Sequence, residues 1–128
     1  MTLAYWCVLI SALLPLGCAA YAKKTARFNF ARDNGSPRDF LARLEGRAAR
    51  AHAAQQNGHE AFAPFAAAVI IAHATGNAAQ GTINCLAVLF VLLRLAFIYC
   101  YLNDRPSLRS AAWSGAMLCT VLLFVAAV

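Results

Sequence analysis

Four long runs of apolar and small residues alternate with shorter polar stretches along the chain. We expect membrane spans at about 3–22, 55–74, 83–102 and 109–128. A helix that crosses the hydrocarbon layer of a membrane needs about 20 mainly apolar residues, because each residue advances the helix by about 1.5 Å. The pattern therefore predicts an all-α integral membrane protein, a bundle of four transmembrane helices.

The second of these spans is the least apolar. Its purely apolar part, 61–74, has 14 residues and is too short to cross a membrane. The span must therefore begin near Gln55, which places Asn57 and Glu60 at membrane depth. Polar groups at that depth usually face the protein interior and mark a functional site.

The connection that precedes this span contains the turn-forming sequence 33–37. Ser36 is a candidate N-cap for a helix that begins at Pro37, with Asp39 in its first turn. We expect this helix to continue without a break to about Ala74. Its first half would then extend beyond the membrane.

All sixteen formally charged side chains lie in two stretches, 23–60 and 94–109. The first has eight Lys and Arg against four acids, and the second has three Arg against one acid, which gives the net charge of +6. Lys and Arg accumulate in cytoplasmic loops. We therefore expect both stretches, including a loop and helix extension over 23–54, to face the cytoplasm, with both termini outside.

An alternative interpretation of the first apolar run, 3–22, is a cleaved signal peptide with a lipoprotein-type cleavage site at 16–18. No basic region precedes this run, and the positive charges follow it. This order of charges favours a retained helix that runs from outside to inside.

Helical spacing brings polar residues of the second and third spans onto shared faces. Arg50, Asn57 and Glu60 fall on about one face of the second helix. Arg94 and Tyr101 share a face of the third helix. Counted from the outer ends of these antiparallel helices, Glu60 and Arg94 lie at about 21 and 17 Å. We expect them to meet as a buried pair, because an unpaired charge there costs at least a few kcal/mol.

Two interpretations of this cluster remain open. In the structural one, Glu60 and Arg94 only neutralise each other and fix the helix register. In the binding one, Asn57, Tyr101 and Arg109 add polar groups at the cytoplasmic end, where they would hold a ligand that bears carboxylates. Arg109 itself is either a headgroup anchor or a cation that stabilises a thiolate, the reactive form of a thiol.

These residues resemble the pattern of a known family. The sequences 50–52 and 57–60, followed by Pro64, are similar to the second-helix motif of the MAPEG family, the membrane-associated proteins of eicosanoid and glutathione metabolism. Arg94 and Tyr101 match the third-helix pattern of that family in the same order. The first and last spans match only in hydrophobicity.

The resemblance implies a homotrimer of four-helix subunits that binds glutathione, as co-substrate, between neighbouring subunits near the cytoplasmic face. In such enzymes arginines hold the carboxylates of the tripeptide. Its thiol is presented to a lipophilic electrophile or hydroperoxide that arrives from the bilayer. The resemblance assigns thiol activation to Arg109. It assigns glutathione binding to Arg50, Asn57, Glu60, Arg94, Tyr101 and Ser110.

The chain departs from the mammalian synthases of this family at two positions. Ala53 stands where they have an arginine, and Phe97 stands where they have tyrosine or histidine. These departures argue against the specific eicosanoid activities and fit a bacterial-type member, expected in the inner membrane, with a broad or unknown substrate. They also favour a non-catalytic protein of the same fold. The alternative is a non-catalytic membrane bundle of the same fold that binds lipid or a protein partner. A proton-coupled exporter ranks last, because 3–22 contains no acid.

Other features indicate ordinary membrane packing. The five cysteines form no C-x-x-C motif and lie in or beside the spans, so we expect them to pack as apolar residues. We expect no metal, because the seven-residue spacing of His52 and His59 is unusual for two ligands of one ion. The basic stretch 23–50 is attributed to membrane lipid, not to nucleic acid, since each basic residue near an anionic surface contributes about 1 kcal/mol.

Overall fold

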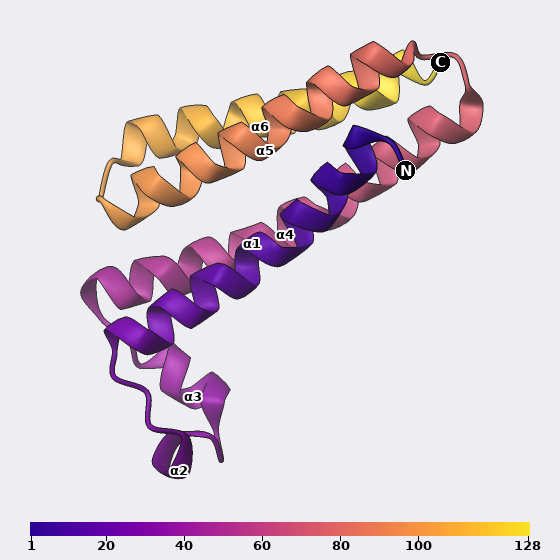
Figure 1. The fold of residues 1–128 in the computed structure, drawn as a ribbon. Coiled ribbons are helices and arrows are strands. Elements are labelled where there is room, and N and C mark those ends of the chain that lie inside the picture. The colour runs from indigo at the N-terminus through magenta and orange to yellow at the C-terminus, as the bar shows by residue number, and fades with distance from the viewer.

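The computed structural model describes residues 1–128 as helices joined by short connections, with no β-strand. The helices are α1 (Leu3–Thr25), α2 (Phe30–Asp33), α3 (Pro37–Ala42), α4 (Gly46–Thr75), α5 (Gln80–Leu102) and α6 (Pro106–Ala126). Of the four long helices, α1 packs mainly against α4, and α5 packs mainly against α6 (Figure 1). The predicted all-helical class is confirmed.

Three helices, α1, α5 and α6, are long and apolar enough to cross a membrane. The longest helix, α4, is not among them, because its N-terminal half carries charged and polar side chains from Arg47 to Glu60. This half includes the start of the predicted span 55–74. The structure therefore establishes three candidate spans, and α4 packs along them.

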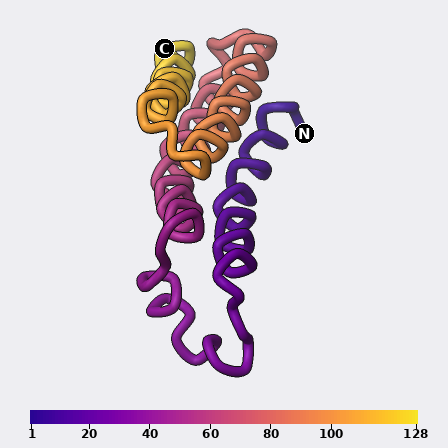
Figure 2. Tube along the Cα trace, turned by 90° about the vertical axis from the view of Figure 1, so that its left-hand side faces the viewer, coloured from indigo at the N-terminus to yellow at the C-terminus, as the bar shows by residue number.

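The short helices α2 and α3 form an arm, residues 26–45, at one end of the bundle. Figures 1 and 2 show that both chain termini lie at the opposite end, and that the turn between α5 and α6 lies at the same end as the arm. The long helices therefore form two antiparallel hairpins, and the charged stretches of the sequence gather at one end.

The prediction of one unbroken helix over 37–74 is wrong. A helix does begin at Pro37, but α3 ends at Ala42, and the next helix starts only at Gly46. Gly46 has a φ angle of +57°, in the left-handed region that glycine adopts most readily. Ser36 is the N-cap residue of α3, but its side chain forms no capping hydrogen bond.

The centre of the bundle is a core of buried apolar side chains from all four long helices. The rings of Phe65 on α4 and Phe90 on α5 stack with their centroids 3.7 Å apart. Close contact between α1 and α4 depends on Gly58, because a Cβ atom at this position would lie 2.7 Å from Cγ of Pro15. Small residues of this kind let the backbones of membrane helices approach closely.

A polar network joins three helices at the end that carries the termini. His73 Nδ1 donates to the carbonyl oxygen of Val69 at 2.7 Å, so its Nε2 accepts, from the Thr2 hydroxyl at 3.0 Å and the Gln80 amide at 3.3 Å. Asn84 Oδ1 accepts from the backbone N–H of Ala4 at 3.1 Å. These bonds attach the start of α1 to the hairpin formed by α4 and α5.

Candidate functional site

A cleft of about 430 Å³ opens between α4, α5 and α6, on the half of the bundle that carries the arm. Four of the seven predicted site residues line it, one from α4, one from α5 and two from α6: Asn57, Tyr101, Arg109 and Ser110. Phe97, Trp113 and Ser114 complete the lining. The cleft therefore combines a cation, hydroxyl and amide groups, and aromatic rings.

Helical periodicity explains why these side chains meet. Phe97 and Tyr101 are four residues apart on α5, and their rings pack edge to face at a centroid distance of 5.4 Å. On α6, Trp113 follows Arg109 by one turn, and Ser114 follows Ser110 by one turn. Residues four apart lie on the same face of a helix, so each helix presents one continuous strip to the cleft.

Arg109 is the cation of the cleft. Its guanidinium carbon lies 4.5 Å from the ring centroid of Tyr101, a distance typical of a cation–π contact. The side chain is half-buried, and the single ion pair of the structure joins Arg32 to Asp33. The charge of Arg109 is therefore not neutralised by a carboxylate, and its N–H groups are free to bind an anion.

Asn57 provides a hydrogen-bond acceptor in the cleft, whereas the predicted site residue Glu60 does not line it. The Asn57 Nδ2 group donates to Glu60 Oε2 at 3.4 Å, and the Glu60 side chain is exposed. The Asn57 Oδ1 atom is buried and has no hydrogen-bond partner. A buried polar atom without a partner is costly, so it favours a ligand that donates a hydrogen bond at this point.

Arg94 does not line the cleft. It is only 3% exposed, and its Cζ atom lies 4.2 Å from the ring centroid of Phe97, whose side chain borders the cleft. Its Nη1 and Nη2 atoms have no hydrogen-bond partner. Arg94 instead borders a small void of about 10 Å³, together with Ser11 and Gly58.

The predicted pair between Glu60 and Arg94 is wrong for the single chain. Glu60 is exposed on α4 and bonds to Asn57, whereas Arg94 points into the interior between α1, α4 and α5. The prediction compared only the depths of the two residues. Depth does not determine the direction in which each side chain leaves its helix.

Arg50, the remaining predicted site residue, also lies outside the cleft. Its Nε atom donates to the carbonyl oxygen of Leu102 at 3.4 Å. Leu102 is the last residue of α5, and the final carbonyl groups of a helix have no partner within it. Arg50 therefore links α4 to the end of α5.

Trp113 and Ser114 were not predicted as site residues. The signal was present, since each lies one helical turn beyond a residue that was selected. The family resemblance, however, covers only Arg109 and Ser110 at the start of this helix. Trp113 is 40% exposed and supplies a large apolar surface at the cleft.

Outside the cleft, the groups that could carry chemistry are metal-binding clusters and reactive cysteines. No group of three or more His, Cys, Asp or Glu side chains lies close enough to hold a metal ion. All five cysteines are free thiols, and only Cys85 is exposed.

The fold and the cleft define an all-helical membrane protein with a cationic site beside its apolar spans. Comparison with protein families agrees with this class, because the model of the MAPEG family matches residues 3–128. The chain belongs to the MAPEG family, which includes glutathione transferases and peroxidases. Neither the comparison with curated proteins nor that with solved structures returned a match.

Proposed function

We propose that this protein is a membrane-bound, glutathione-dependent transferase or peroxidase that acts on lipophilic electrophiles or hydroperoxides. The observation that carries the proposal is Arg109, a cation without a carboxylate partner, held over Tyr101 in a cleft of a MAPEG-family chain. The thiol of glutathione is its reactive group, and it becomes nucleophilic when a nearby cation favours the thiolate.

Arg109 has the role of stabilising that thiolate. A free thiol with a pKa of about 8.5 is only a few per cent ionised at pH 7. A guanidinium that stabilises the anion by about 2.7 kcal/mol lowers this pKa by about two, which makes the thiolate the main form. The sulfur then attacks the second substrate, whose apolar part rests against Trp113 and Phe97. An electrophilic carbon releases its leaving group as the C–S bond forms. A hydroperoxide loses its terminal oxygen to sulfur as the O–O bond breaks, which gives the alcohol and a sulfenic acid that a second glutathione converts to the disulfide and water.

The other cleft residues bind and orient the tripeptide. Arg109 binds negatively charged groups of glutathione. The hydroxyl groups of Ser110 and Tyr101 form hydrogen bonds with its polar groups. Asn57 Oδ1 is an acceptor suited to its amino group, and Glu60, which does not line the cleft, acts through its hydrogen bond to Asn57. Arg94 and Arg50 do not line the cleft but position residues near it. Arg94 packs against Phe97, and Arg50 forms a hydrogen bond to the end of α5.

The proposed assembly is a homotrimer of subunits that each cross the membrane four times, with α4 as the fourth crossing helix. The exposed Glu60 on α4 supports this assembly, because a carboxylate in contact with lipid hydrocarbon is unfavourable. A neighbouring subunit that covers this face would remove the contact and close the glutathione site. The proposed location is the bacterial inner membrane, with the arm in the cytoplasm and both termini outside; the positive stretches support this orientation.

A non-catalytic bundle that binds lipid or a protein partner is the second candidate. It is favoured by Phe97, which presents hydrocarbon to the cleft where related synthases have a side chain that forms hydrogen bonds. Calorimetry with glutathione separates the two candidates. We expect saturable binding by the detergent-purified protein, together with thiolate absorbance near 240 nm.

The decisive variant is Arg109→Ala, with Arg105→Ala as the matched control. Arg105 is an exposed arginine one turn earlier that does not line the cleft. We expect Arg109→Ala to lose the thiolate absorbance and Arg105→Ala to retain it. Absence of glutathione binding by the folded wild-type protein would contradict the proposal and leave the non-catalytic bundle.

A further inference from the structure

The basic segment 23–50, which consists of the arm and the adjoining ends of α1 and α4, carries an excess of positive charge, of which the proposed function uses only Arg50. Between residues 23 and 50 the chain has eight basic and three acidic side chains, a net charge of +5. Only Arg32 is neutralised in an ion pair, with Asp33. Lys24, Arg38 and Arg43 are exposed and have no carboxylate partner. The surface therefore attracts an anionic partner.

The arm also exposes an aromatic side chain. Phe28 packs edge to face against Phe40 at 5.0 Å, and the Lys23 ammonium lies 4.6 Å from the Phe28 ring. Phe30 takes no part in this cluster and is 74% exposed. Apart from the terminal residues Met1 and Val128, no large apolar residue of the chain is more exposed. A surface with basic groups and an exposed aromatic ring is typical of segments that bind a membrane interface.

The position of the arm decides which anionic partner it meets. Figure 1 shows α2 and α3 turned aside from the line of α1 and α4, and Figure 2 places them where α1 ends and α4 begins. Because α1 is a candidate membrane span, its end at Thr25 lies at the membrane surface. An arm that leaves this point sideways lies along the lipid headgroups.

We propose that the arm is a binding surface for anionic lipid headgroups, with Phe30 inserted at the boundary between headgroups and acyl chains. The free basic side chains contact lipid phosphates: Lys24 at the end of α1, and Arg38 and Arg43 on the arm. The arm is attached at both ends to helices of the bundle, so lipid is always at high local concentration. This tether favours lipid over nucleic acid, which would have to bind from solution.

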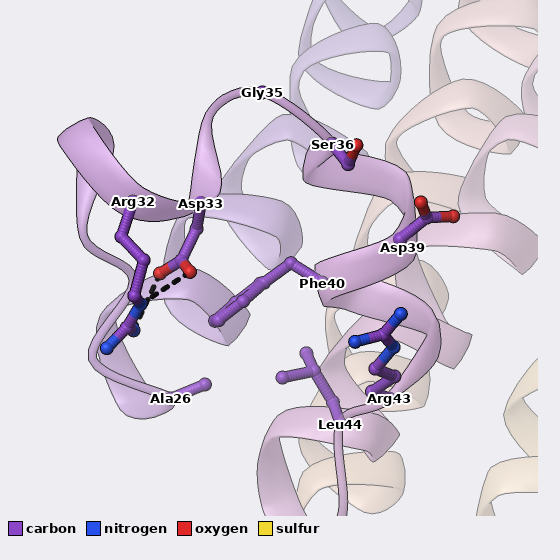
Figure 3. Close-up of a pocket in the computed structure, with 9 residues that line it drawn as sticks. All are labelled: Ala26, Arg32, Asp33, Gly35, Ser36, Asp39, Phe40, Arg43 and Leu44. Carbon is purple, nitrogen blue, oxygen red and sulfur yellow. Dashed lines mark hydrogen bonds and ion pairs between the residues drawn. The ribbon is translucent and has the colours of Figure 1, made fainter.

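The pocket within the arm does not bind the lipid phosphate on its own. Figure 3 shows this pocket of about 430 Å³, in which Arg32 is paired with Asp33 and a second acid, Asp39, lies along the wall with Arg43. Its two bases and two acids balance. The attraction therefore comes from the excess of basic side chains over the whole segment 23–50, which includes the ends of α1 and α4.

Hydrogen exchange of the full-length protein in lipid nanodiscs tests this proposal. Discs of phosphatidylcholine alone are compared with discs that contain about one-third phosphatidylglycerol. One basic residue near an anionic surface changes the binding constant about fivefold. We expect amide exchange in 26–45 to be at least about fivefold slower in the anionic discs. Exchange in 83–102 should not differ, which controls for a general effect on the bundle.

Charge variants identify the surface. In the triple variant Lys24→Gln, Arg38→Gln and Arg43→Gln, we expect the exchange rates in the two kinds of disc to become nearly equal. The charge-conserving variant Arg38→Lys and Arg43→Lys should keep the protection. Arg105→Gln removes a base outside the arm and should also keep it. These controls separate loss of charge from loss of fold.

Three results would overturn the proposal. The first is equal exchange of the wild-type arm in both kinds of disc. The second is protection that persists in the triple variant or is lost in the charge-conserving variant. The third is protection by an added oligonucleotide but not by phosphatidylglycerol, which would assign the surface to nucleic acid.

Discussion

At the scale of single residues, the environment of Arg94 conflicts with its permanent charge. Its two terminal nitrogen atoms are buried without hydrogen-bond partners, within a helix that is a candidate membrane span. The contact with Phe97 offsets only part of this cost, since a cation–π interaction contributes about 0.5 to 2 kcal/mol. A desolvated charge without a partner costs several kcal/mol.

We therefore predict that Arg94→Met does not destabilise the protein. Methionine fills a similar elongated volume without a charge, and such replacements of buried charged groups are often neutral or stabilising by about 1 to 4 kcal/mol. Thermal unfolding in detergent should show an equal or higher midpoint. Arg94→Ala should lower the midpoint, because it leaves a cavity. A clear loss of stability in Arg94→Met would show that a carboxylate reaches Arg94 in the assembled protein.

Asp33 gives a prediction about pH. Hydrogen bonds from the Arg32 guanidinium at 2.7 and 2.8 Å, and from the backbone N–H of Asn29 at 2.8 Å, hold the pKa of Asp33 at about 2. The folded pKa lies below the usual value near 3.8. The ionised carboxylate therefore stabilises α2 above about pH 4, and this contribution is lost as the pH falls towards 2.

Carbon NMR of the Asp33 carboxyl group should give a titration midpoint near 2 in wild type. In Arg32→Gln the midpoint should move upwards, because the largest cause of the low pKa is removed. An unchanged midpoint in this variant would show that the ion pair is not formed in solution.

The sequence predicted part of the cleft but not the environment of Arg94 in the interior of the bundle. Periodicity and depth brought Asn57, Tyr101 and Arg109 to one region, and these three residues do line one cleft. The partner of Arg94 could not be predicted in the same way. Its direction depends on how α1 packs on α4, and that packing is set by small residues whose contacts have no periodic signature.

At the scale of helices, the contact between α1 and α4 depends on one glycine. We predict that Gly58→Ala destabilises the protein by about 1 to 3 kcal/mol, the usual cost of overpacking a dense core. Its Cβ would lie 2.7 Å from Cγ of Pro15, and the proline ring cannot rotate away. Thermal unfolding in detergent measures the effect.

Gly17→Ala is the matched control for this prediction. Gly17 is also helical, but no side-chain or distant atom lies within 4 Å of the position of its Cβ. Alanine in a helix is favoured over glycine by about 0.5 to 1 kcal/mol, so this variant should be equally stable or more stable. If both variants have the same stability, close approach at Gly58 is not important for the fold.

The observed helix boundaries agree with the prediction where the local sequence signal is strong. They differ from it at Gly46, whose backbone conformation is unusual. Pro37 begins a helix as predicted, and Pro106 begins α6 three residues before the predicted span 109–128. The break before Gly46 was missed because an isolated glycine in a helical pattern does not by itself reveal a positive φ. The hydrophobic pattern therefore identified the long helices but not the joint between α3 and α4.

At the scale of the whole molecule, the distribution of charge predicts how the bundle is oriented in the membrane. The arm and the turn between α5 and α6 lie at one end and carry basic residues, whereas residues 76–79 at the other end carry no charge. Basic residues are retained on the cytoplasmic side during membrane insertion. The end with the arm, and with it the opening of the cleft, should therefore face the cytoplasm, where glutathione is available.

We predict that single cysteines at the two ends react differently with a maleimide that cannot cross membranes. Ala79→Cys, at the uncharged end, should be labelled in cells whose inner membrane is intact. Ser36→Cys, in the arm, should be labelled only after that membrane is permeabilised. Both positions are exposed, and neither original side chain forms a hydrogen bond that caps a helix. A Cys85→Ala background removes the one exposed native thiol. The opposite labelling order would place the cleft on the outer side of the inner membrane, away from cytoplasmic glutathione, and would contradict the orientation and the proposed reaction together.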